Sequence, residues 1–155
     1  MKRVPKQATS KAAAYFELTK PNITFLILIS TALGYYLGGD GIDNNIRFLV
    51  TLAGSCLVSS GAGALNHFAE MDSDWLMDRT KKRPIPTGMI EPDHARLFGV
   101  VLTLAGAGLL YFNVNPLTCV LALITTLLYI FIYTLTKFFY LIFKSIFNFI
   151  SYFIF

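Results

Sequence analysis

Four acidic or amide side chains recur at every fourth position in one polar stretch of this chain: Asn66, Glu70, Asp74 and Asp78. On an α-helix this spacing places them along one face, as a polar stripe. Like charges at that spacing repel each other by roughly a few tenths of a kcal/mol per pair, so a row of carboxylates favours a counter-ion. Oxygen ligands of this kind suit Mg²⁺, which takes one or two carboxylates and fills its other positions with water and phosphate oxygens. The stretch therefore predicts a magnesium site.

The same stretch reverses its charge directly afterwards, because Arg79, Lys81, Lys82 and Arg83 follow before Pro84. These cations could hold the rest of an anionic group, arginine with its two-pronged guanidinium and lysine as a point charge. A basic run beside a membrane helix is by itself typical of a cytoplasmic loop. That interpretation explains the cations, but it does not explain acids at helical spacing. We therefore expect a ligand that carries phosphate groups.

The elements that position this stretch are membrane helices. The chain has 155 residues, of which 55% are hydrophobic, and a net charge of +4; its mean hydropathy is +0.59. A soluble domain of this length cannot bury so much apolar sequence, so the fold class is all-α integral membrane. Four spans are expected, followed by a hydrophobic C-terminal tail, at about residues 23–37, 48–65, 95–112 and 117–133.

Other function classes receive no support from the composition. No basic surface interleaved with aromatic residues indicates a nucleic-acid partner. Both cysteines, Cys56 and Cys119, lie inside apolar spans, so they predict neither a disulfide framework nor a thiolate metal site.

The distribution of positive charge predicts the orientation in the membrane. The N-terminal arm, residues 1–22, is strongly basic, the loop after the polar stretch is basic, and Lys137 follows the fourth span. The two intervening connections carry few cations, with only Arg47 near the first. The positive-inside rule then places the arm, the polar stretch and Lys137 on the cytoplasmic or matrix side.

The polar stretch also carries a family resemblance. Its pattern is Asn-x3-Glu-x3-Asp-x4-Arg-Thr-x2-Arg-Pro, from Asn66 to Pro84. It resembles the first aspartate-rich motif of the UbiA-type intramembrane prenyltransferases, and among them it is most similar to the haem O synthase (protohaem IX farnesyltransferase) branch. Two flanking segments agree, Leu18-Thr19-Lys20-Pro21-x-Ile23-Thr24 and Tyr133-Thr134-x2-Lys137. The resemblance covers roughly residues 14–137.

The resemblance implies transfer of a farnesyl group from farnesyl diphosphate to the vinyl group of haem B. It implies Asn66, Glu70 and Asp74 as catalytic residues and Mg²⁺ ligands, with Asp78 as a further candidate ligand. It implies that the diphosphate is bound by Arg79 and Arg83, with Lys82 and Lys20 as secondary candidates. The expected location is the bacterial inner membrane, in preference to the mitochondrial one, with contact to the haem A or terminal oxidase assembly pathway.

The chain also departs from this family. Family members resemble a ring of about twice as many helices with a second aspartate-rich motif, whereas no acid follows Lys137 here. We therefore expect residues 23–137 to be the N-terminal half of a prenyltransferase membrane domain, a half-site that binds its ligands weakly and does not catalyse alone. Residues 138–155 use only Phe, Tyr, Leu, Ile, Lys, Ser and Asn. This composition suggests a frameshifted tail, with a natural short hydrophobic terminus as the alternative.

Two other functions remain open. The acceptor could be an aromatic quinone precursor instead of haem B, although the Arg-Thr-x2-Arg-Pro ending favours the haem branch; the acceptor that becomes prenylated distinguishes the two. The chain could also be a non-catalytic membrane fragment whose carboxylates only solvate the end of a helix.

Overall fold

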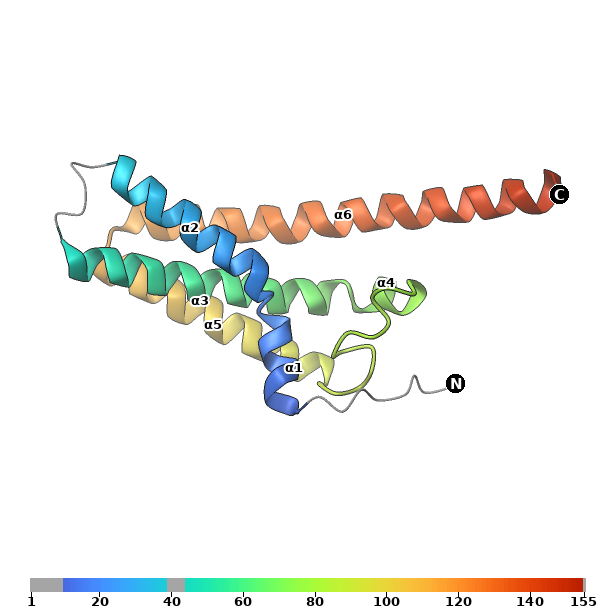
Figure 1. Ribbon diagram of the computed structural model, residues 1–155, viewed down its shortest axis with the longest axis horizontal. Coiled ribbons are helices and arrows are strands. Elements are labelled where there is room, and N and C mark those ends of the chain that lie inside the picture. Colours follow the sequence, from blue (N-terminus) through green and yellow to red (C-terminus); the bar gives the residue numbers. More distant parts are fainter. Residues whose placement is uncertain (1–9, 39–43, 155) are drawn as a thin grey trace.

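The computed structural model describes residues 10–38 and 44–154, and in them all regular secondary structure is helical (Figure 1). Side chains are described as far as residue 136 and at residue 139. The helices are α1 (Lys11–Leu18), α2 (Pro21–Leu37), α3 (Asn45–Ala69), α4 (Met71–Leu76), α5 (Pro92–Asn113) and α6 (Pro116–Ile154).

The predicted all-α membrane architecture is confirmed. Helices α3 and α5, and Pro116–Thr136 of α6, are long and apolar enough to cross a membrane. Helix α2, which corresponds to the first predicted span, is an apolar helix of only 17 residues. A membrane interior requires about 20 helical residues, so α2 is somewhat short for a full crossing.

Helices α3 and α5 form the closest pair in the bundle because glycines line both sides of their contact. Gly54 and Gly61 of α3 face Gly106 and Gly99 of α5, and in each helix the two glycines are seven residues apart. A Cβ added at Gly61 would lie 2.6 Å from the carbonyl oxygen of Gly99, and one at Gly106 would lie 2.7 Å from that of Gly54. The two backbones therefore touch, which is how small residues hold membrane helices together.

The N-terminal arm contains a helix that the sequence analysis did not identify. Ser10 caps α1 by accepting a hydrogen bond from the Ala13 backbone N–H at 3.2 Å. Lys20 then adopts a left-handed conformation with φ of 49°, and the chain turns sharply into α2. This elbow rests on α3, since a Cβ at Gly63 would lie 2.8 Å from the Leu18 carbonyl oxygen.

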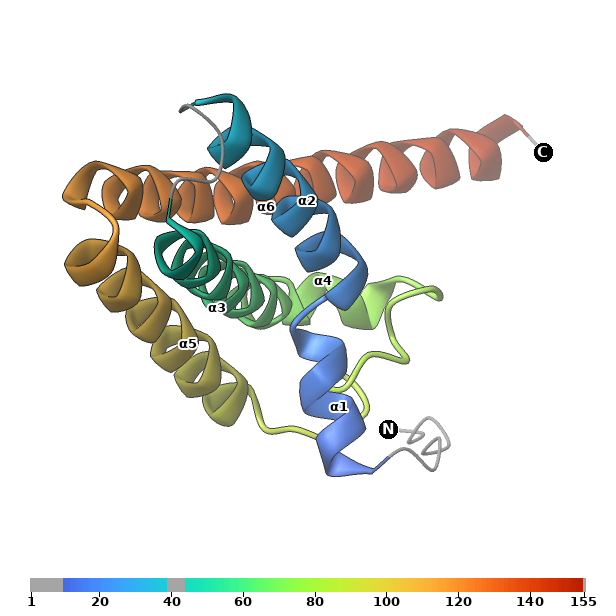
Figure 2. The same ribbon diagram turned by 60° about the vertical axis from the view of Figure 1, so that its left-hand side comes forward.

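Helix α1 lies beside the loop that leads into α5 (Figures 1 and 2). Ala14 and Leu18 form one apolar cluster with Ala64 of α3, with the loop and with α5. The loop and α5 contribute Ile85, Ile90 and Ala95 to it. All of these residues are buried, so α1 fixes the path of the loop.

The connections between the helices lie at two ends of the bundle (Figure 1). One end holds the α1–α2 elbow, the polar stretch and the loop after it. At the other end, Arg47 near the start of α3 donates a hydrogen bond of 2.7 Å to the Val114 carbonyl, between α5 and α6. Which end faces the cytoplasm remains a prediction.

Helix α6 is a single helix of 39 residues, and its backbone does not break at Lys137, where the composition changes. Its C-terminal part extends beyond the other helices in both views (Figures 1 and 2). The proposed boundary at residue 138, and the origin of the segment after it, remain predictions.

Candidate functional site

Asn66, Glu70 and Asp74 come together across a helix junction. Helix α3 ends at Ala69 and α4 begins at Met71, with Glu70 between them at φ −97° and ψ 1°. Hydrogen bonds from Glu70 N to Asn66 O (3.0 Å) and from Asp74 N to Glu70 O (2.8 Å) continue the helical pattern through the junction. The predicted stripe therefore survives at these three positions, although the helix is interrupted.

All three residues are deeply buried, with 0%, 2% and 0% of the residue surface exposed for Asn66, Glu70 and Asp74. Buried carboxylates are costly unless they are paired and hydrogen-bonded. Arg83 supplies that pairing. Its Nη1 donates to Glu70 Oε2 at 3.1 Å and to Asp74 Oδ1 and Oδ2 at 3.1 and 2.8 Å.

The electrostatics of Arg83 follow from these contacts. Burial by itself lowers the pKa of the guanidinium, but the hydrogen bonds and negative charges of Asp74 and Glu70 outweigh burial and raise it. Arg83 is therefore a permanent cation here. Its charge also acts on Glu17 of α1, whose pKa is raised by partial burial and lowered to a smaller extent by Arg83.

The loop that carries Arg83 is folded, although it contains no long helix. Thr80 is 1% exposed, and its Oγ1 donates to the Asp74 carbonyl at 3.2 Å. Thr87 Oγ1 donates to the Arg83 carbonyl at 2.9 Å, and Met89 N donates to the Pro84 carbonyl at 3.0 Å. These bonds hold the Arg83 backbone in place, so the position of its side chain over the carboxylates is built into the loop.

Other residues of the predicted site lie apart from this cluster. Asp78 follows the end of α4; its side chain is 91% exposed and forms an ion pair with Lys81. The stripe therefore does not extend to Asp78, because the helix has already ended. Arg79 and Lys82 are exposed on the loop.

Asn66 provides the clearest indication of a ligand. Within the described part of the chain, neither its Oδ1 nor its Nδ2 has a hydrogen-bond partner, although both atoms are buried. Leaving a buried polar group unsatisfied costs about 1–3 kcal/mol, so such groups require an explanation. An amide oxygen beside two carboxylates is a donor set that suits a hard divalent cation.

The described residues offer only part of a metal coordination shell. The residues that the structure describes include no group of three or more His, Cys, Asp or Glu side chains that could hold an ion. Asn66, Glu70 and Asp74 fit a cation that completes its coordination with water and ligand oxygens, as Mg²⁺ commonly does at phosphate sites.

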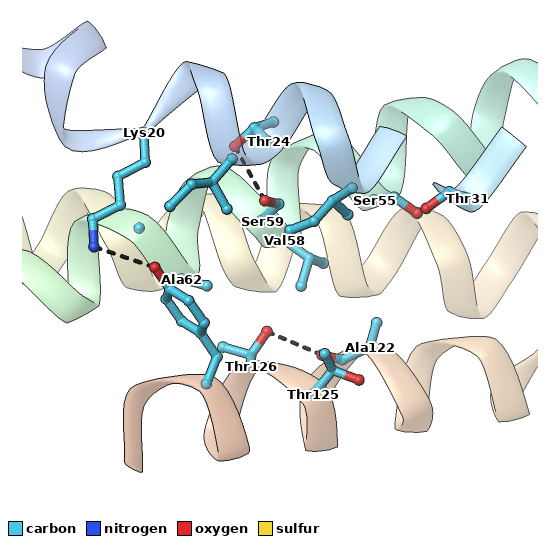
Figure 3. Close-up of a pocket in the computed structure, with 14 residues that line it drawn as sticks. Lys20, Thr24, Thr31, Ser55, Val58, Ser59, Ala62, Ala122, Thr125 and Thr126 are labelled. Atoms are coloured by element: carbon cyan, nitrogen blue, oxygen red, sulfur yellow. Dashed lines mark hydrogen bonds between the residues drawn. The ribbon is translucent and has the colours of Figure 1, made fainter. Parts of the chain in front are cut away.

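A cavity of about 230 Å³ lies between α2, α3 and α6 (Figure 3). Its wall is mainly apolar, with hydroxyl groups along it. The lining residues include Ile23, Ile27, Val58, Ala62, Ala122 and, among the hydroxyls, Thr31, Ser55 and Thr125. Thr24 and Ser59 share a hydrogen bond of 3.1 Å across the α2–α3 contact (Figure 3).

Lys20 lies at one end of this cavity (Figure 3). Its Nζ donates to the Tyr129 hydroxyl at 3.2 Å. The ammonium also lies over two rings of α6, 5.5 Å from the centroid of Tyr129 and 5.1 Å from that of Tyr133. These contacts place the Lys20 ammonium at the end of the cavity that lies on the same side of the bundle as the polar stretch.

The roles of Tyr129 and Thr80 in these contacts were not predicted. Tyr129 lies one helical turn before Tyr133, so i, i+4 aromatic spacing was the available signal. Thr80 belongs to the quoted motif, but the sequence offered no reason to expect its bond to the Asp74 backbone, which depends on how the loop folds.

The sequence matches the UbiA prenyltransferase family over residues 27–155. Similar curated proteins include the protoheme IX farnesyltransferase of Leptospira biflexa, 43% identical over 119 residues, which are 77% of this chain and 42% of that protein. The protoheme IX farnesyltransferase of Picosynechococcus sp. is 39% identical over 121 residues (78% and 38%), and that of Streptomyces coelicolor is 39% identical over 126 residues (81% and 40%). The chain thus spans about two fifths of the length of these relatives. No solved structure matches it.

Proposed function

Because this chain belongs to the UbiA prenyltransferase family, we propose that it provides the first diphosphate-binding half-site of a protohaem IX farnesyltransferase. The reaction transfers farnesyl from farnesyl diphosphate to the vinyl group of haem B. The observation that carries this proposal is the buried cluster of Asn66, Glu70 and Asp74, joined by Arg83, at the same end of the bundle as Lys20. The similarity to protoheme IX farnesyltransferases supports the choice of substrates.

The chemistry of an allylic diphosphate explains why this cluster is useful. When the bond between carbon and oxygen breaks, negative charge grows on the departing pyrophosphate, so catalysis depends on stabilising that charge. Arg83 is a partly buried cation in contact with both carboxylates, and its guanidinium provides a two-pronged donor for phosphate oxygens. Arg79 and Lys82, being exposed, would act at the solvent side of the ligand.

A bound Mg²⁺ would be held by Asn66, Glu70 and Asp74 and would neutralise charge on the diphosphate. Residues of the chain bind the ligand and exclude water. Lys20 binds at the inner side of the ligand, where its ammonium already meets Tyr129. The apolar wall of the cavity, including Ile23 and Val58, accommodates part of the prenyl chain and excludes water from the reacting carbon.

We further propose that the end carrying this cluster faces the cytoplasm in a bacterial inner membrane. Lys20 at the α1–α2 elbow and the basic residues of the loop after α4 lie at that end, whereas Arg47 lies at the other. This distribution supports the orientation through the positive-inside rule.

The experiment uses membranes that contain the full chain, supplied with haem B, farnesyl diphosphate and Mg²⁺, and measures both bound diphosphate and haem O. We expect diphosphate binding that Asp74→Asn reduces by at least tenfold. The matched control is Asp72→Asn, which removes the same charge from an exposed position on the same short helix. Haem O formed by wild type and lost in Asp74→Asn would establish catalysis by this chain alone.

A parallel assay with an aromatic quinone precursor distinguishes the acceptors. If a prenylated aromatic product forms and haem O does not, the acceptor is the aromatic compound and not haem B. The half-site proposal itself would then still hold. Diphosphate binding equal in wild type and Asp74→Asn would contradict the proposal itself.

A structural role for the cluster is the second candidate, and the contacts of Arg83 favour it. One guanidinium satisfies both carboxylates, as in a buried ion pair that only joins the loop to α4. Removing one partner of such a pair destabilises a protein by about 3–5 kcal/mol. Under this alternative, Asp74→Asn lowers stability without any effect on ligand binding in the molecules that remain folded.

A further inference from the structure

Arg83 and a metal ion would compete for the same carboxylate oxygens. Arg83 Nη1 contacts Oε2 of Glu70 and both carboxylate oxygens of Asp74. A cation that uses Asp74 as a ligand must therefore take over at least one oxygen that Arg83 now occupies. The guanidinium and the metal ion cannot both keep their full set of contacts.

The charges of these groups show what must accompany the binding of a metal ion to the carboxylates. Two carboxylates and one guanidinium carry a net charge of −1, and the two acids are 1% and 0% exposed in their side chains. A divalent cation changes this balance to +1 and leaves a guanidinium, only 22% exposed, without its carboxylate partners. Such a buried cation is costly unless another anion replaces those partners. A diphosphate, with several oxygens for a forked donor, is an anion of the required kind.

We propose that Arg83 is an exchangeable counter-ion, which pairs with Glu70 and Asp74 in the empty site and transfers to the diphosphate when Mg²⁺ takes the carboxylates. Metal and diphosphate then bind cooperatively. The diphosphate draws Arg83 away from the carboxylates that the metal needs, and the metal draws the carboxylates away from the guanidinium that the diphosphate needs. This inference deepens the proposed function and rests on it for the identity of the anion.

The loop allows this transfer to be a movement of the side chain alone. The Arg83 carbonyl accepts hydrogen bonds from Thr87 Oγ1 (2.9 Å) and Thr87 N (3.1 Å), and Arg83 N donates to the Thr80 carbonyl at 3.0 Å. The backbone is thus held on both sides, while the bonds to the acids involve only Nη1 at the tip of the side chain. Rotation about side-chain bonds can redirect that tip without refolding the loop.

The test measures each ligand in the absence of the other, so that formation of Mg²⁺–pyrophosphate in solution has no influence. The full chain is placed in lipid nanodiscs, and binding is followed by the fluorescence of Trp75. Trp75 is the single tryptophan of the chain, is half-exposed and directly follows Asp74. One titration uses Mg²⁺ without phosphate, and the other uses pyrophosphate with EDTA.

Arg83→Gln removes the guanidinium that occupies oxygens of both carboxylates, so we expect it to tighten the binding of Mg²⁺ alone. Asp74→Asn weakens the hold on Arg83, so we expect it to tighten the binding of metal-free pyrophosphate. Couplings between sites are typically about 5- to 150-fold, and we expect each gain to be at least about fivefold. The controls remove equal charges from exposed positions: Arg96→Gln, whose guanidinium lies over the Phe68 ring of α3, for the first titration and Asp72→Asn for the second, each with a change below about twofold.

The two variants also distinguish exchange from fixed roles. If Arg83→Gln binds Mg²⁺ as weakly as wild type, or more weakly, the exchange is refuted. The exchange is also refuted if Asp74→Asn binds metal-free pyrophosphate no more tightly than wild type does. Should Arg83→Gln fail to fold, Arg83→Lys replaces it, because a single ammonium cannot hold all three oxygens and must still give tighter Mg²⁺ binding. Circular dichroism of each variant identifies the folded ones.

Failure of the exchange can be separated from failure of the proposed function. Gains in both titrations without any prenylated product would support the exchange and contradict the enzymatic role. Product formation without either gain would retain the enzymatic role and refute the exchange.

Discussion

Replacing Gly61 by alanine should separate the two helices at the centre of the bundle. An added Cβ would meet Thr103 Oγ1 and would lie 2.6 Å from the Gly99 carbonyl oxygen and 2.7 Å from the Thr103 backbone nitrogen. Two of these three atoms belong to the backbone of α5, which cannot rotate away as a side chain can. The clash is relieved only if α3 and α5 move apart, with loss of contact along the whole pair.

The size of the effect follows from two opposing terms. Overpacking a close contact costs about 1–3 kcal/mol, while the change from glycine to alanine favours the helix by about 0.8–1 kcal/mol. Gly61→Ala should therefore be destabilising by up to about 2 kcal/mol, as the difference of these two terms. Gly108→Ala is the matched control, because a Cβ on Gly108 of α5 meets nothing within 4 Å. It should be stabilising by the propensity term of about 0.8–1 kcal/mol.

The assay is reversible unfolding in mixed micelles with increasing SDS, followed by far-ultraviolet circular dichroism. Adding Thr103→Ala to Gly61→Ala removes only the side-chain part of the clash, so it should restore part of the stability but not all of it. Equal stability of Gly61→Ala and Gly108→Ala would refute the close approach of the two backbones.

Three further results are expected elsewhere in the molecule. Gly63→Ala should displace the elbow between α1 and α2, because its Cβ would lie 2.8 Å from the Leu18 carbonyl oxygen; faster labelling of Lys20 by an amine reagent would report the displacement. Lys20→Met and Tyr129→Phe should be coupled by about 1 kcal/mol in a double-mutant unfolding cycle, since they share one hydrogen bond; additive losses would exclude that bond. Glu17→Gln should be neutral or slightly stabilising at neutral pH, because burial raises the Glu17 pKa. Wild type should gain stability as the pH falls through that raised pKa to the ordinary glutamate value, and melting temperatures of Glu17→Gln should lack this gain.

Some parts of this site were predictable because they depend on neighbours along the chain. The fourfold spacing of Asn66, Glu70 and Asp74 places them on one face of any helical path, and a short interruption at Glu70 does not alter that. Helical class, the approximate spans and the separation of charges between two ends follow from apolar length and from the order of basic segments. These properties need no knowledge of which helices touch.

Other parts were decided by contacts between distant segments. The sequence did not distinguish Arg79 from Arg83 as the main cation of the motif. In the structure Arg83 contacts Glu70 and Asp74, while Arg79 is exposed and Lys81 pairs with Asp78. The loop path makes this choice, and burial of Ile85 and Ile90 against α1 and α3 sets that path. Lys20 meets Tyr129 from 109 residues away because its elbow rests on Gly63.

The amino-acid sequence by itself thus determined that this is a membrane bundle with carboxylates at one end, since these features arise from periodicity and composition. The resemblance to the UbiA type came from the motif between Asn66 and Pro84. Only the tertiary structure decided which cation pairs with the buried acids and which acid remains in solvent. The physical reason is that a buried charge must find its partner in three dimensions, and the loop that brings Arg83 back to Asp74 is folded by apolar packing and backbone hydrogen bonds.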